Sequence, residues 1–138
     1  MSVQEFLTAQ LNDVGNQLTA VFANYPEQNW HEKVTPEAMS PAETAYHLAD
    51  CYNAFLTSAA GGKHEWGSTV IEDQTPTGQI SAMLALRAKC LDIAASSDDP
   101  KIQGLASDYI SLHDAYHVGQ MVTLRMKLED FDSYSIYK

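Results

Sequence analysis

Apolar side chains recur at steps of three and four residues along most of this 138-residue chain, and this period constrains the fold more than any other feature. Because an α-helix has about 3.6 residues per turn, residues at this spacing share one face. The first segment, from about Ser2 to Asn24, therefore predicts an amphipathic helix. Its apolar stripe consists of Val3, Phe6, Leu7, Leu11, Val14, Leu18, Val21 and Phe22.

The clearest helix start in the sequence is at Ser40. Its hydroxyl can cap a helix, Pro41 suits the first helical position, and Glu43 completes a capping box. This second helix is expected to continue through His47 until the Gly61-Gly62 pair ends it.

Two more helices are predicted in the second half of the chain. The third covers about Pro76–Ala95, with its stripe at Ile80, Met83, Leu84, Arg87, Ala88 and Leu91. The fourth covers about Gly104–Glu129, with an inward face of Ala106, Ile110, His113, His117, Met121, Leu124 and Leu128. On a regular helix Asp114 would point about 100° away from His113, toward the surface.

Four helices of this length are expected to pack as an all-α four-helix bundle. Residues 1–130 would form the bundle, with two long connections over 25–39 and 61–75. Residues 131–138 form a C-terminal tail with Phe131, Tyr134 and Tyr137. This tail is either loose or a patch that contacts a second subunit.

The charge balance limits the partners of the chain. It has 8 basic and 18 acidic residues and a formal net charge of −10, so it should bind neither nucleic acid nor anionic membranes. No apolar run approaches the roughly 20 residues of a membrane span, and the N-terminus does not read as a signal peptide. Two cysteines, Cys51 and Cys90, are too few for a disulfide framework, which fits a cytoplasmic location.

His113 and His117 form the pair that most suggests chemistry. Residues at i and i+4 lie on one side of a helix, one turn apart, so both imidazoles could bind one metal ion. A lone buried histidine is usually satisfied by a partner in the core. Two on one apolar face are harder to satisfy, and a shared cation would serve both.

A third ligand is best supplied by the second helix, where His47 lies among small residues that leave room for a cavity. His31 and His64 fall in polar connections and are expected to be solvated. Glu43 and Asp50 could orient His47 or simply face solvent.

Other residues near the predicted ligands have two interpretations each. Cys51 could ligate or react, but it is more often a small apolar neighbour in such a position. Gln120, Tyr109 and Tyr116 could line a pocket beside the histidines. Trp66 could cover the site or plug one end of the bundle.

Several of these segments resemble the DinB/YfiT-like superfamily of damage-inducible-type metalloenzymes. The resemblance is carried by Ser40-Pro-Ala-Glu43 with His47-Leu-Ala-Asp50, by His113-Asp-Ala-Tyr-His117-Val-Gly-Gln120, and by Leu124-Arg125. It covers the chain from its first helix to about Leu128. It implies an up-down-down-up bundle and a metal triad of His47, His113 and His117.

The resemblance also implies a function. Superfamily members include thiol S-transferases that use low-molecular-weight thiols, so a divalent metal ion (Zn, Ni or Fe) would activate a thiol toward a small electrophile. A metal-dependent hydrolase and a non-catalytic metal-binding stress protein are the alternatives. The resemblance and the aromatic tail together predict a homodimer.

Overall fold

The computed structural model describes all 138 residues and contains helices but no strands. Its helices are α1 (Val3–Phe22), α2 (Pro41–Ala59), α3 (Pro76–Ser96), α4 (Pro100–Ala106) and α5 (His113–Leu128), with a π-helical segment, η2 (Ser107–Leu112), joining α4 to α5. Two short 3₁₀ turns, η1 (Glu27–Asn29) and η3 (Ser133–Tyr137), complete the chain. The predicted all-α bundle is therefore confirmed.

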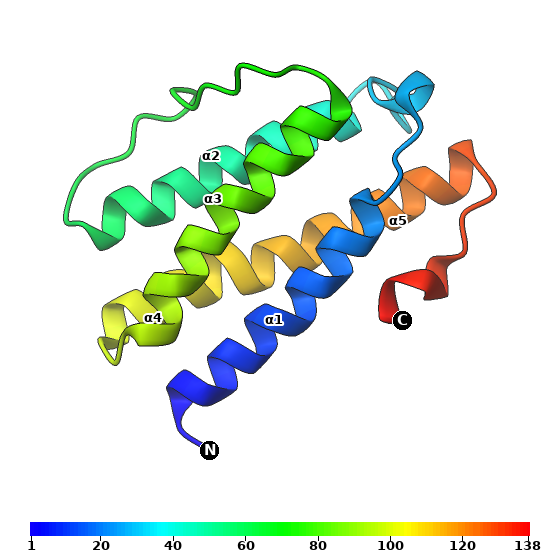
Figure 1. The fold of residues 1–138 in the computed structure, drawn as a ribbon. Helices are drawn as coiled ribbons and strands as arrows, with labels where there is room; N and C mark the ends of the chain where they lie inside the picture. The colour runs from blue at the N-terminus through cyan, green and yellow to red at the C-terminus, as the bar shows by residue number, and fades with distance from the viewer.

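The helices run in the expected order of directions. In Figure 1, α1 and the continuous α4–α5 helix run one way, whereas α2 and α3 run the other way side by side. The connection from residue 60 to residue 75 returns along the bundle so that α3 can begin beside the start of α2. None of the helices combines the length and apolar character that a membrane crossing would require.

Side-chain caps decide where the helices begin. The predicted box at the start of α2 is present, because the Glu43 amide donates to Ser40 Oγ and the Ser40 amide donates to Glu43 Oε1. The last long helix begins at Pro100, earlier than the predicted Gly104. Asp99 caps it by accepting from the amide of Lys101, and the proline occupies the first turn.

The apolar stripe predicted for α1 is narrower than expected. Leu11 and Leu18 are buried in the core, but Val3 and Phe6 are exposed. Phe6 lies about 100° from Leu7 around the helix and so falls outside the buried face. The buried residues of α3 also differ from the predicted set and are Gln79, Met83, Arg87, Cys90 and Ala94.

The π-helical segment changes which face of the last helix is buried. A π turn inserts an extra residue and so rotates everything that follows it. Buried positions consequently recur at three successive steps of four, from Ala106 through Ile110 and Asp114 to Val118. The prediction that Asp114 faces solvent is wrong, since its side chain is fully buried.

Asp114 belongs to a polar network in the centre of the bundle. Arg87 Nε donates to Asp114 Oδ2 at 2.8 Å, and Tyr52 Oη donates to Asp114 Oδ1 at 2.6 Å. Arg87 Nη2 also donates to the carbonyl of Leu11 at 2.7 Å. The Arg87 guanidinium occupies the space where a side chain at position 15 would begin, so α1 needs Gly15 there. The network ties α1, α2, α3 and α5 together.

The C-terminal tail is folded onto the bundle. Its η3 turn packs against α1 and buries Ile136, so the tail is not loose. Tyr134 and Tyr137 remain exposed on its outer side.

Candidate metal centre

Three histidine rings from two helices meet on one side of the bundle. His47 comes from α2, and His113 and His117 come from the first turns of α5. The Nε2 atom of His113 lies 3.1 Å from that of His47 and 3.0 Å from that of His117. Their candidate ligand atoms all lie within 4.8 Å of one another. The three predicted ligands are therefore together in space.

The spacing of these nitrogens fits a shared cation. In a tetrahedral zinc site with Zn–N bonds of about 2.0–2.1 Å, neighbouring ligand nitrogens lie about 3.3 Å apart. A neutral imidazole has one N–H and one lone pair, so His113 Nε2 cannot form good hydrogen bonds with both neighbours. The buried Nδ1 atoms of His113 and His117 have no partner in the chain either. A cation held between the three Nε2 atoms would engage all three lone pairs.

The environment keeps the triad neutral, which metal ligation requires. Burial lowers the pKa of His47 and of His113 below the usual value. Burial is also the largest cause that lowers the pKa of His117, to about 4, and the neighbouring histidines add to it. Near neutral pH all three rings therefore offer lone pairs.

Cys51 lies one turn after His47, with its Sγ 3.8 Å from His47 Nε2. Burial raises the pKa of its thiol to about 12, and the nearby carboxylates of Asp50 and Asp114 act in the same direction. In the metal-free protein the thiol is therefore protonated at neutral pH, and it packs as a small apolar neighbour of the triad.

Asp50 is directed away from the triad. Its carboxylate accepts hydrogen bonds from Thr69 Oγ1 at 2.5 Å and from the Gly67 amide at 2.9 Å. It also lies 3.0 Å from His64 Nε2, and both side chains are only 7% exposed. The expectation that His64 is solvated is therefore wrong. Asp50 and His64 hold the long connection onto α2, and the Thr69 and Gly67 contacts lower the pKa of Asp50.

Glu43 does not reach the histidines. Its carboxylate is committed to the Ser40 cap and to an ion pair with Lys33 at 3.2 Å, and these partners lower its pKa. It lines a surface depression together with His47 and His31, and His31 is solvent-exposed as predicted.

The aromatic residues differ in their distance from the triad. The Tyr116 ring lies edge-on to His117 with centroids 5.0 Å apart, and its hydroxyl accepts a hydrogen bond from Gln120 Nε2 at 3.0 Å. Tyr109 is half-buried in the π-helical segment and packs on the core. Trp66 is exposed and packs on His64 in the connection, so it neither covers the triad nor plugs the bundle.

Sequence reasoning missed the buried polar network next to the candidate ligands. Asp114 directly follows His113, and Tyr52 and Arg87 hold its carboxylate. One signal was present in the sequence, because a charged Arg87 within an apolar stripe requires a buried acidic partner.

Comparison with known proteins identified no relative of this chain. No protein-family model matches the chain, and neither a curated protein nor a solved structure matches it. The functional interpretation therefore rests on the three histidines and on the residues around them.

Proposed function

We propose that this chain is a divalent-metal-binding protein of the DinB/YfiT-like superfamily and a metal-dependent enzyme of the thiol S-transferase type. One observation carries the proposal, namely that the Nε2 atoms of His47 and His117 each lie within 3.1 Å of His113 Nε2. The superfamily assignment is supported by the sequence from His113 to Gln120 and by the segment that begins at Ser40.

The donor set suits a catalytic ion better than a structural one. Imidazole is a common ligand of zinc, nickel and iron, and closed structural zinc sites normally have four protein ligands. Here His47, His113 and His117 supply three, all neutral. A divalent cation held by them supplies Lewis acidity, which lowers the pKa of a thiol or water molecule that reaches it.

The residues around the triad favour a thiol as the nucleophile. Hydrolysis of an ester or amide usually employs a side chain that carries protons to and from the reacting atoms. No carboxylate is free for that role, because Asp50 is held by the long connection and Asp114 by Arg87. A thiol has an ordinary pKa of about 8.5 and needs no such base once it is coordinated.

The thiol must come from outside the chain. Cys51 and Cys90 are both buried away from solvent, and Cys90 Sγ is directed at the carbonyl of Tyr52. A low-molecular-weight thiol as donor and a small electrophile as acceptor are therefore the substrates that we propose.

Thiol conjugation to a chromogenic aryl halide, measured on metal-loaded protein with a panel of small thiols, tests this proposal. The rate should require metal and fall by about 10²-fold or more in His117→Ala, as expected when a metal ligand is removed. Cys51→Ala and the exposed control His31→Ala should keep the wild-type rate. Metal-dependent ester or amide cleavage without thiol would favour the hydrolase, and metal binding with neither activity would favour the stress protein.

A further inference from the structure

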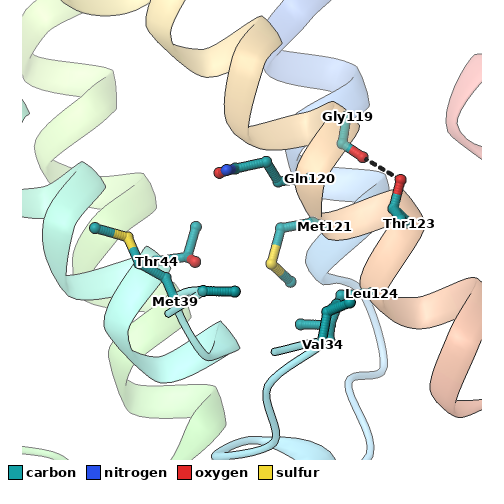
Figure 2. Close-up of a pocket in the computed structure, with 9 residues that line it drawn as sticks. Val34, Met39, Thr44, Gly119, Gln120, Met121, Thr123 and Leu124 are labelled. Carbon is teal, nitrogen blue, oxygen red and sulfur yellow. Dashed lines mark hydrogen bonds between the residues drawn. The ribbon is translucent and has the colours of Figure 1, made fainter. Parts of the chain in front are cut away.

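A cavity of about 380 Å³ lies between α5, the first turn of α2 and the chain that precedes α2. Figure 2 shows Met39 and Thr44 on one side of it and Met121 on α5 on the other. Its volume falls in the range of small-molecule pockets, about 300–1,000 Å³. Its nine lining residues are Val34, Ala38, Met39, Thr44, Gly119, Gln120, Met121, Thr123 and Leu124.

The cavity adjoins the histidine triad along both helices. Gln120 and Met121 follow His117 by three and four residues, and Thr44 precedes His47 by three. One helical turn rises about 5.4 Å, so the cavity begins one turn from the ligands. Gln120 also donates to the hydroxyl of Tyr116, whose ring lies against His117.

The chemistry of the lining is apolar and uncharged. None of the nine residues carries a charge. The hydroxyls of Thr44 and Thr123 donate to backbone carbonyls of their own helices, at Ser40 and Gly119. The Gln120 amide is the remaining polar side chain, and Figure 2 shows it extending from α5 toward α2.

The charges around the cavity disfavour a negatively charged ligand. Glu43 and Asp50 line the neighbouring surface depression that includes His47, and the chain carries a net charge of −10. An anionic ligand would lose hydration in the cavity, find no charged side chain among the nine lining residues, and be repelled by the net charge of the chain.

We propose that this cavity binds an uncharged, predominantly apolar small molecule and presents it to the histidine triad. Its role as the site of the acceptor electrophile rests on the proposed function. Met39, Met121 and Leu124 would contact the apolar body, and Gln120 would bond a polar atom at the end that faces the triad.

Two nearly isosteric fluorescent probes test the proposed selectivity. N-phenyl-1-naphthylamine is neutral, whereas 8-anilino-1-naphthalenesulfonate adds one negative charge. Metal-loaded protein should bind one equivalent of the neutral probe, with a Kd at least about tenfold lower than that of the sulfonate. Equal affinity for the two probes would overturn the proposal.

Matched glycine variants locate the probe. A Cβ atom added at Gly119, on the cavity wall, meets no atom within 4 Å, and the same holds for Gly104 on α4. Gly119→Trp should raise the Kd of the neutral probe about tenfold or more, and Gly104→Trp should leave it unchanged. An unchanged Kd in folded Gly119→Trp would contradict the assignment.

A charge variant tests the cavity independently of whether Gly119→Trp folds. Gln120→Lys should shift the preference toward the sulfonate, because it adds a cation beside the cavity. An unaltered preference would count against the cavity. Conversion of a dimer to a monomer by Gly119→Trp, measured by light scattering, would show that a second subunit covers the cavity and would also overturn the proposal.

The two proposals can fail separately. Cobalt in place of zinc should broaden the proton resonances of the bound neutral probe, and no broadening would exclude its presentation to the triad. Elemental analysis of the same samples reports the metal site. Suppose that the protein contains no metal and still binds the neutral probe, with binding lost in Gly119→Trp. That result would refute only the proposed metal function.

Discussion

Asp114, the residue directly after the candidate ligand His113, accepts a 2.8 Å hydrogen bond from Arg87 Nε in the centre of the bundle. Both side chains are almost completely buried, and the Tyr52 hydroxyl completes the carboxylate's partners. The pair therefore links the core directly to the turn of α5 that carries the histidines.

Removing one partner of this pair should be strongly destabilising. Arg87→Met would leave the Asp114 carboxylate buried without its cation and should lower the free energy of unfolding by about 3–5 kcal/mol. Denaturant unfolding measures the change. The control Lys33→Met breaks the exposed pair with Glu43 and should cost less than about 1 kcal/mol. Equal effects in the two variants would contradict the structure.

The triad should bind about one equivalent of divalent metal per chain. Elemental analysis of purified protein should show this metal in the wild type and in His31→Ala, whose side chain is exposed. Alanine variants of His47, His113 and His117 should each lose most of it, because two imidazoles hold a cation less tightly than three. Full retention by folded His113→Ala and His117→Ala would exclude this site.

The stability of the metal-free protein should fall on acidification in a window set by the triad. The pKa of His117 is lowered to about 4, so below its ordinary value of 6.5 the unfolded chain binds a proton that the folded chain does not. Stability is then complete above about pH 6.5 and decreases by up to about 3 kcal/mol as the pH falls to about 4. His47 and His113 act in the same direction, since burial lowers their pKa values too.

Denaturant unfolding at a series of pH values measures this decrease, and His117→Gln should make it smaller. Bound metal should be released over the same acidic range, because protons compete for the imidazole lone pairs. Stability and metal affinity that stay constant from about pH 8 to about pH 5 would argue against a buried imidazole triad.

We expect the protein to form a homodimer through the folded tail. Tyr134 and Tyr137 are 73% and 69% exposed beside the anchored Ile136, and aromatic side chains are enriched in interfaces. Light scattering at micromolar concentration should give twice the chain mass, and Tyr134→Ser with Tyr137→Ser should give the monomer. Trp66→Ser removes an exposed aromatic side chain elsewhere and should leave the dimer intact. A monomeric wild type would refute the expectation.

Features that depend on neighbouring residues could be predicted from the sequence alone. The Ser40–Glu43 capping box is a local arrangement, and the apolar period along α1 follows from helix geometry. Helix geometry also places His113 and His117 on the same side of α5, because four residues make about one turn. These local rules predicted the all-α bundle and two of the three candidate ligands, and family resemblance together with the small residues around it supported His47.

Features that depend on distant partners were decided only by the tertiary structure. Asp114 is buried because the π-helical segment rotates α5 and because Arg87, 27 residues earlier, meets its carboxylate. His64 is buried because the long connection folds back onto Asp50. The 3.1 Å approach of His47 to His113 likewise depends on how α2 packs beside α5. Periodicity reports which way a side chain faces along its own helix, whereas these contacts depend on the rotation and spacing of helices far apart in the chain.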